Sequence, residues 1–241
     1  MFIPDKTYCD ALVEECSDVI KKDFNIDGYD ISCYYHNNID HASMLYYQAF
    51  ELDGLTFVKN SGFIWDRYLM THKLYYLNEN DLVNANELSD GQIVNVTEIV
   101  EGETFIFIKL PNGRIIPKTR MGFDNDVCKN VRLICKHNRD IRVLVSGCMK
   151  NGYHPIFKYY NDNITLIAVR TTTGDYIDLK NVEFNIMKSR SYEINDDNSN
   201  IEYWVNYSKQ KENFIGWILY FNDRMIKLKT RWCKIKQKIS S

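Results

Sequence analysis

The chain has 241 residues, of which 45% are hydrophobic, 14% aromatic and 26% charged, and its formal net charge is −2. This composition excludes a disordered chain, and it lacks the overall positive charge that marks many nucleic-acid-binding domains. No apolar run reaches the length of a membrane span, so we expect no membrane partner.

The predicted elements begin with a helix and continue mainly as strands. Apolar residues recur at helical spacing from Cys9 to Ile20, which predicts an amphipathic helix over residues 6–23. Pro111-Asn112-Gly113-Arg114 predicts a hairpin turn, since Asn-Gly accepts positive φ. Runs of apolar and β-branched residues predict strands over 55–59, 92–100, 104–110 and 114–120.

The second half of the chain repeats this mixture. Helices are predicted over 124–137 and 201–209, with a polar loop over 195–200 between them. Further strands are predicted over 142–145, 156–160, 164–170, 182–187, 214–221 and 224–229. The last two strands form a hairpin around Asn222-Asp223. One α+β domain rich in antiparallel sheet follows from this order of elements.

Cysteine and histidine spacing excludes the usual metal and disulfide patterns. The seven cysteines are odd in number and include no Cys-x-x-Cys pair, and the five histidines show no ligand spacing. We therefore predict free thiols, no metal site and a reducing, cytoplasmic location, which includes the cytoplasm of a virus-infected cell.

Six short motifs and one longer stretch stand in a fixed order along the chain. The stretch over residues 73–80, Lys-Leu-Tyr-Tyr-Leu-Asn-Glu-Asn, precedes the motif Leu88-Ser89-Asp90-Gly91. The others are Glu51-Leu52-Asp53-Gly54, Lys118-Thr119-Arg120, Phe157-Lys158-Tyr159, Phe214-Ile215-Gly216-Trp217, and Ile226-Lys227-Leu228-Lys229 followed by Trp232.

In order and spacing these motifs resemble the nucleotidyltransferase domain of phage-type ATP-dependent RNA ligases, over residues 30–233. The resemblance implies an α+β fold of packed antiparallel sheets flanked by helices, with a central cleft. It implies a single ligase-like domain over residues 1–241. Residues 1–30 would carry an N-terminal helix, and the C-terminal helical domain of some family members would be absent.

The chain departs from the family at four positions. Leu88 occupies the place of the lysine that takes AMP covalently, and leucine has no nucleophilic atom. Asp53 replaces an arginine that helps to hold the nucleotide, while Lys158 and Ile215 replace two glutamates expected to serve the metal and the ribose. The resemblance thus implies a degenerate member, a pseudoenzyme without catalytic residues, metal or cofactor.

The family positions that remain are on the phosphate side of the implied site. We predict that they bind RNA ends, nucleotides or another phosphorylated ligand, in a counter-defence or sequestering role: Lys73, Asp90, Gly91, Lys118, Arg120, Lys158, Lys227 and Lys229. For Lys227 and Lys229, solvated strand residues are the alternative interpretation.

Two other functions stay open at this stage. One is a protein-interaction module on a ligase fold, which inhibits or scaffolds a protein partner. The other is a divergent active ATP-dependent RNA ligase, in which Lys73 or Lys118 would substitute as nucleophile and ATP and Mg²⁺ would be required.

Overall fold

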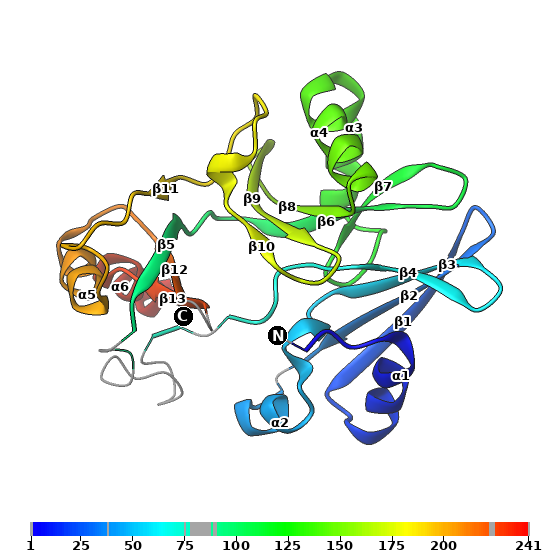
Figure 1. The fold of residues 1–241 in the computed structure, drawn as a ribbon, viewed down its shortest axis with the longest axis horizontal. Helices are drawn as coiled ribbons and strands as arrows, with labels where there is room; N and C mark the ends of the chain where they lie inside the picture. Colours follow the sequence, from blue (N-terminus) through cyan, green and yellow to red (C-terminus); the bar gives the residue numbers. More distant parts are fainter. Residues whose placement is uncertain are drawn as a thin grey trace. The chain divides into compact units, whose positions relative to one another are not determined.

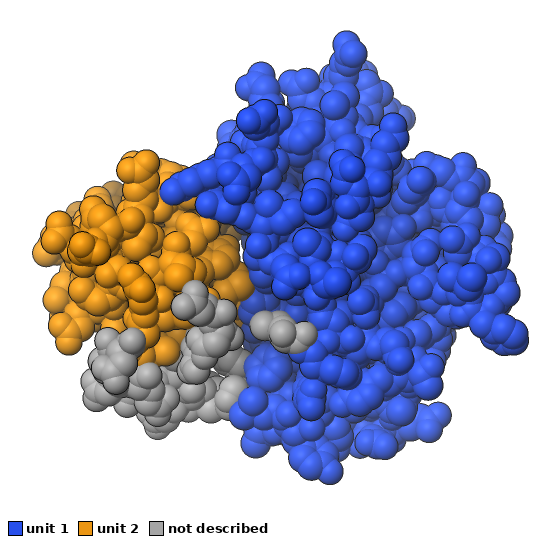
Figure 2. Space-filling model, viewed as in Figure 1, with its two compact units in different colours: residues 1–73, 102–188 blue, residues 74–101, 189–241 orange. Residues whose placement is uncertain are grey.

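The structure is a computed structural model that describes residues 2–37, 39–74, 76, 77, 88, 91–221 and 225–240. It divides into two compact units, which Figure 1 shows as ribbons and Figure 2 in separate colours. Unit 1 comprises Met1–Lys73 and Gly102–Lys188, and unit 2 comprises Leu74–Glu101 and Ser189–Ser241. Each unit is therefore built from two separate stretches of chain.

Unit 1 contains two packed antiparallel sheets. One has the order β1-β2-β3-β4, with strands β1 (Val19–Ile26), β2 (Tyr29–His36), β3 (Leu55–Ser61) and β4 (Ile64–Tyr68). The other has the order β10-β9-β8-β6-β7, with strands β6 (Glu103–Lys109), β7 (Ile115–Thr119), β8 (Tyr153–Tyr160), β9 (Asn163–Thr171) and β10 (Tyr176–Ile177). The helices of this unit are α1 (Lys6–Glu15), α2 (His41–Tyr46), α3 (Asp126–His137) and α4 (Arg139–Lys150), with 3-10 turns η1 (Ala49–Leu52) and η3 (Leu179–Asn181).

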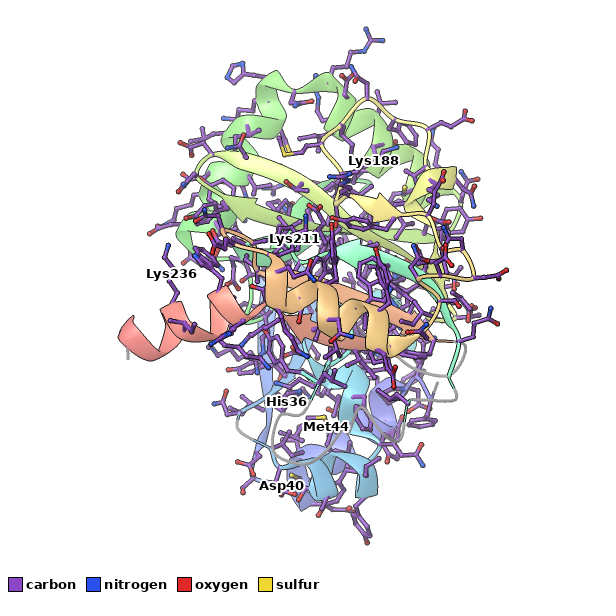
Figure 3. All side chains as sticks on the ribbon, turned by 90° about the vertical axis from the view of Figure 1, so that its left-hand side faces the viewer. His36, Asp40, Met44, Lys188, Lys211 and Lys236 are labelled. Atoms are coloured by element: carbon purple, nitrogen blue, oxygen red, sulfur yellow. The ribbon has the colours of Figure 1, made fainter. Side chains whose placement is uncertain are left out.

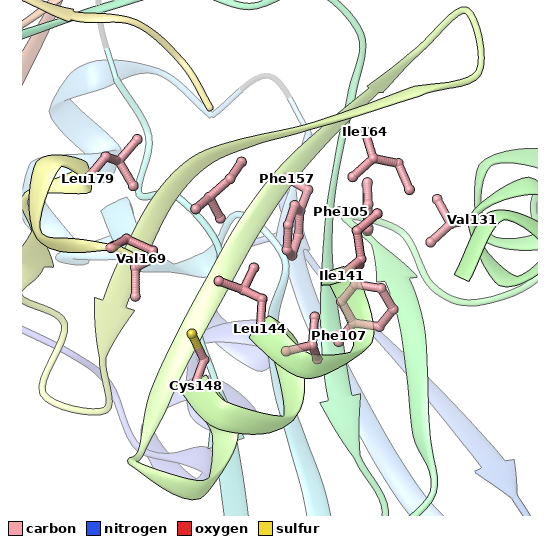
Figure 4. Packing of buried hydrophobic residues seen from close by; sticks show 13 residues of the cluster. Phe105, Phe107, Val131, Ile141, Leu144, Cys148, Phe157, Ile164, Val169 and Leu179 are labelled. Carbon is pink, nitrogen blue, oxygen red and sulfur yellow. The ribbon is translucent and has the colours of Figure 1, made fainter. Parts of the chain in front are cut away.

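Side-chain alternation along the strands gives unit 1 its layers. On β6, Phe105 and Phe107 pack with residues of α3 and α4, whereas Ile106 and Ile108 pack with Ile31 and other residues of the β1–β4 sheet. Figure 4 shows the helix-side core, where Phe105 and Phe157 stack with ring centroids 5.3 Å apart. The β6–β10 sheet is thus buried on both faces.

The N-terminal helix is shorter than predicted. The Asp5 side chain accepts from the Tyr8 N–H at 2.8 Å and caps the start of α1, and the helix ends at Glu15. The prediction over 6–23 was wrong beyond this point, because Val19 begins β1 and pairs with His36 of β2. Helical spacing and strand alternation coincide at Val19 and Ile20, so the apolar pattern did not separate them.

The segment predicted as a strand over 142–145 is instead part of α4. The Asn138 side chain accepts from the Ile141 N–H at 3.1 Å and caps the helix. Ile141, Leu144, Val145 and Cys148 are buried at helical spacing. Residues 142–145 were therefore wrongly predicted as a strand, because the cap at Asn138 was not recognised.

The strand predicted over 182–187 was also wrong. This segment follows η3 and contains no named strand, although Val182, Phe184 and Ile186 pack on the helix-side core. Its backbone meets the β6–β10 sheet at Leu166, whose N–H donates to the Met187 carbonyl at 2.9 Å. Buried and exposed residues therefore alternate along this segment although no continuous strand pairs with it.

Unit 2 is built around one antiparallel sheet and its own aromatic core. The sheet has the order β11-β5-β12-β13, with strands β5 (Ile93–Glu98), β11 (Ser191–Tyr192), β12 (Gly216–Phe221) and β13 (Met225–Lys229), and the helices are α5 (Ile201–Gln210) and α6 (Arg231–Ser240). Trp204 of α5 meets Trp217 of β12 edge-on, with centroids 5.6 Å apart, and both side chains are buried. The predicted helix over 201–209 and the last hairpin are confirmed, while the turn at Asn222-Asp223 lies outside the described residues.

A buried histidine makes the stability of unit 1 depend on pH. His154 accepts from the Leu69 N–H at 3.3 Å through Nδ1, and burial, followed by the charges of Arg170 and Arg67, lowers its pKa from 6.5 to about 4. Below pH 6.5 the His154 side chain therefore becomes protonated in the unfolded chain but stays neutral in the folded protein. The contribution of His154 to the free energy of unfolding is fully present above pH 6.5. It is lost as the pH drops toward 4, by about 3 kcal/mol in total.

Urea unfolding between pH 4 and 7.5 measures this effect. His36 contributes in the same direction, because burial lowers its pKa too. A His154→Gln variant keeps the His36 contribution and should lose the part of the pH slope that His154 supplies. Equal slopes in the variant and the wild type would show that His154 is not the group responsible.

Candidate functional site

The predicted site residues of unit 1 gather where the end of β7 meets the segment before β3. Lys118 has a fully buried side chain, and its Nζ donates to the Gly54 carbonyl at 2.7 Å. Burial lowers the pKa of this ammonium. Gly54 has φ +96°, and a Cβ there would lie 3.3 Å from the Arg120 Cα, so only glycine permits this close approach. Lys118 thus ties two segments of the fold together.

Arg120 and Asp53 form an ion pair at the same place. The Arg120 Nε contacts Asp53 Oδ1, its Nη2 donates to the His36 carbonyl, and its guanidinium lies 5.7 Å from the centroid of the Tyr35 ring. Asp53, expected from the resemblance to stand in place of an arginine, therefore pairs with Arg120, one of the cations expected to bind phosphate. The pair is half-buried, with side chains 35% and 25% exposed.

His36 is a polar residue of this cluster that the sequence did not single out. Its side chain is 3% exposed, and its Nε2 has no hydrogen-bond partner among the residues that the structure describes. Burial lowers the pKa of His36. The negative charge of Asp53 opposes this shift, whereas the positive charges of Arg120 and Lys73 lower the pKa further. Lys73 thus belongs to the same neighbourhood. A lone histidine at the end of a strand carries no sequence signal that could have identified it.

Lys158 shares a face of its sheet with Lys118. Lys118 pairs with Ile106 of β6, and Lys158 pairs with Thr104, two residues along the same strand. The Lys158 Nζ donates to the Gly102 carbonyl at 2.6 Å, and burial lowers its pKa. An ammonium that donates to a carbonyl offers no lone pair to a metal ion.

In unit 2, Leu88, at the expected nucleophile position, belongs to the hydrophobic core. Leu88 is 3% exposed and packs in the cluster that contains Leu77, Ile93 and Phe221. Gly91 donates from its N–H to the Leu88 carbonyl at 3.0 Å. Asp90 of this motif lies outside the described residues.

Ile215 lies at the other end of the sheet from this turn. Phe221 at the end of β12 pairs with Ile93, whereas Gly216 at its start pairs with Lys229 and accepts from the Ile99 N–H at 2.9 Å. The structure therefore does not bring Ile215 beside Leu88. The Ile215 side chain has no atom that could bind a metal ion or a ribose hydroxyl.

Lys227 and Lys229 lie together on one face of β13. Trp217 and Leu228 of the paired strands point into the aromatic core, so the lysines, at alternate positions, point to the opposite face. Tyr76 lies beside them, because the Leu77 N–H donates to the Lys227 carbonyl at 2.8 Å. The Nζ atoms of Lys227 and Lys229 lie 5.4 and 3.6 Å from the centroid of the Tyr76 ring. We call these three residues the lysine face.

The helix after β13 extends the positive charge. Residues 225–240 include six lysines and arginines and no acidic residue: Lys227, Lys229, Arg231, Lys234, Lys236 and Lys238. Arg231, Lys234 and Lys236 are exposed, and Lys236, labelled in Figure 3, lies 4.5 Å from the Trp232 ring centroid. In unit 2 the ammonium groups of Lys227 and Lys229 thus lie beside the Tyr76 ring, and that of Lys236 lies beside the Trp232 ring.

The predicted residues therefore fall into two groups. Asp53, Lys118 and Arg120 are together in unit 1 near Lys73, while Lys227 and Lys229 are together in unit 2. Within the described residues, no cluster of three His, Cys, Asp or Glu side chains is placed to hold a metal ion. The residues at the expected metal positions, Lys158 and Ile215, do not fit one. No helix in the described part of the chain has the length and apolarity needed to cross a membrane.

Comparison with known proteins identifies the fold. No protein-family model and no curated protein matches the sequence. Among solved structures, the chain is similar to an archaeal ATP-dependent RNA ligase in two forms. Form 2 has a TM-score of 0.62 and 10% identity over 97% of this chain, and form 1 has 0.58 and 10% over 95%. The chain spans 63% and 62% of the length of those two chains.

This similarity confirms the predicted fold. The chain has the α+β nucleotidyltransferase fold of RNA ligases, with packed antiparallel sheets and flanking helices. The resemblance to RNA ligases is thereby confirmed at the level of the fold.

Proposed function

We propose that this protein is a ligase-like protein that does not transfer AMP and that binds the phosphorylated end of an RNA, or a related nucleotide, through the lysine face of unit 2. The observation that carries the proposal is the position of two ammonium groups against one aromatic ring on a single face of β13. The archaeal structures with this fold are described as ATP-dependent RNA ligases, which makes RNA the first ligand class to consider.

The lysine face suits a nucleotide with a phosphate. Lysine ammonium groups bind phosphate oxygens through charge-assisted hydrogen bonds, and a tyrosine ring offers a surface on which a base stacks. The exposed cations of α6 continue this charge along the chain and suit a phosphate backbone. A net charge of −2 does not oppose such a site, because the positive charge is local.

Loss of AMP transfer is supported by the chemistry of the replaced positions. Leu88 is apolar and buried, so the motif that should present an amine presents a packed side chain. Asp53 is paired with Arg120, and Lys158 donates to a backbone carbonyl. Lys118, a possible substitute nucleophile, is fully buried. None of these arrangements favours nucleophilic attack on ATP.

Charge reversal of the lysine face tests the binding proposal. We expect Lys227→Glu with Lys229→Glu to weaken binding of a short 5′-phosphorylated single-stranded RNA by about tenfold or more, because each lost charged hydrogen bond costs about 1.5–3 kcal/mol. The slope of log K against log salt should fall by about 1.4, at about 0.7 for each phosphate contact on a single strand. Fluorescence anisotropy across a salt series measures both quantities.

A matched control lies in the same unit. Lys209→Glu with Lys211→Glu makes the same charge change at the end of α5, where Lys209 is exposed and Lys211 is half-buried against Tyr207; Figure 3 labels Lys211. This control should bind RNA nearly as the wild type does. If both double variants lose the same affinity, general charge is responsible and the lysine face is not the site.

A further inference from the structure

A groove of about 390 Å³ lies between the helix pair and the sheet of unit 1, and none of the candidate-site residues described above lines it. Its walls come from β6 and β7 on one side and from α3 and α4 on the other. Phe107 and Ile141, both labelled in Figure 4, belong to this region and to the helix-side core. The volume lies in the range of small-molecule sites, about 300–1,000 Å³.

The inner walls of the groove are apolar. They consist mainly of aromatic, aliphatic and proline side chains: Phe107, Ile115, Pro117, Ile141 and Val145. Burial raises the pKa of the Cys135 thiol to about 11, although the positive charge of Arg142 opposes this shift. Cys135 therefore lines the groove as an uncharged thiol. Such a surface favours a hydrocarbon or aromatic body over a sugar or a bare phosphate.

The lining also carries positive charge without negative charge. Arg132 and Lys136 come from α3 and Arg142 from α4, and no acidic side chain is among the described residues that line the groove. The Arg132 Nη2 donates to the Phe123 carbonyl at 3.3 Å, but its Nε is buried and has no hydrogen-bond partner in the described part of the chain. The positive charge on this side of the groove therefore comes from two exposed side chains, Lys136 and Arg142, and from the partly buried Arg132.

We propose that this groove binds a small amphipathic acid, with an apolar body against the β6–β7 wall and a single carboxylate among Arg132, Lys136 and Arg142. A medium-chain fatty acid has this chemistry. Ser146, also in the lining, supplies a hydroxyl near the same helix face. The groove contains few groups that could read a nucleobase, so this ligand differs in class from the one assigned to the lysine face.

Titration of the full chain with decanoate, followed by calorimetry, tests the proposal. The wild type should bind one decanoate, and decanol, which lacks the charge, should bind about tenfold more weakly, since one charged hydrogen bond is worth about 1.5–3 kcal/mol. Ser146→Trp should abolish binding by filling the groove from a half-buried position. Arg142→Glu should weaken binding by about tenfold or more for the same reason as decanol.

Arg139→Glu is the matched control, because Arg139 is exposed on the same helix and does not line the groove. It should bind as the wild type does. Absence of decanoate binding to the wild type would overturn the proposal. So would binding that survives both Ser146→Trp and Arg142→Glu, since the acid would then occupy another place. Arg142→Glu changes an exposed residue, so it separates loss of the site from loss of folding.

Discussion

Replacing Glu51 with leucine is expected to lower the free energy of unfolding of unit 1 by about 3–5 kcal/mol, the cost of removing one partner of a buried ion pair. The side chains of Glu51 and Arg170 are 1% and 0% exposed. The two Nη atoms of Arg170 donate to the two carboxylate oxygens at 2.8 and 2.7 Å. Leucine would leave the guanidinium buried without a counter-charge, although it also donates to the Met70 and Gly174 carbonyls.

Urea unfolding and hydrogen exchange of unit 1 amides measure this loss. The double variant Glu51→Leu with Arg170→Met should recover part of it, because no unpaired charge then remains. Asp53→Asn breaks the half-exposed pair with Arg120 and should cost no more than about 1 kcal/mol. A Glu51→Leu protein as stable as Asp53→Asn would contradict the assignment of this pair as a central support of unit 1.

Placing a lysine at the expected nucleophile position by Leu88→Lys is expected to destabilise unit 2 and not to create an adenylating enzyme. Leu88→Ala should cost about 2–5 kcal/mol, as truncations in packed cores do. Leu88→Lys should cost at least as much, because an ammonium replaces an alkyl group at a position that is 3% exposed. Leu88→Met keeps the volume and should cost less than about 1.5 kcal/mol.

Hydrogen exchange of the β5 and β12 amides measures this loss of stability in the strands next to Leu88. The core around Leu88 contains Ile93 and Phe221, whose strands pair at that position. Amides of both strands should exchange faster in Leu88→Ala and Leu88→Lys than in Leu88→Met. If Leu88→Lys is as stable as the wild type and becomes labelled by ATP, the site has kept its other catalytic parts.

Much of the fold could be predicted from the sequence because local signals and family order agreed. The Asn112-Gly113 turn lies where expected, with φ +86° at Gly113, and joins β6 to β7. The errors occurred where helical and strand spacing coincide, or where a strand would need a neighbouring strand to pair with. At Val19 the helical and strand patterns coincide, while the segment from Val182 to Ile186 alternates without a continuous strand beside it. Asp27 and Gly28, both with positive φ, mark the β1–β2 hairpin that was missed.

The candidate site was less predictable than the fold. A sequence places Lys118 and Arg120 on one strand, but it does not reveal that one is fully buried and the other is paired with Asp53. These contacts join residues more than 60 positions apart. Glu51 and Arg170 are 119 apart, and no local pattern connects them. By contrast, the alternate spacing of Lys227 and Lys229 on a strand did indicate a shared face, which the structure confirms.

The intact mass of the wild-type protein after incubation with ATP and Mg²⁺ tests the proposed loss of AMP transfer most directly. A ligase fold with leucine at the nucleophile position and Lys118 buried should give an unchanged mass after denaturation, at any ATP concentration and with or without 5′-phosphorylated RNA. One added adenylyl group that survives denaturation would contradict the proposal. Mapping it to a peptide would then identify the lysine that serves as nucleophile.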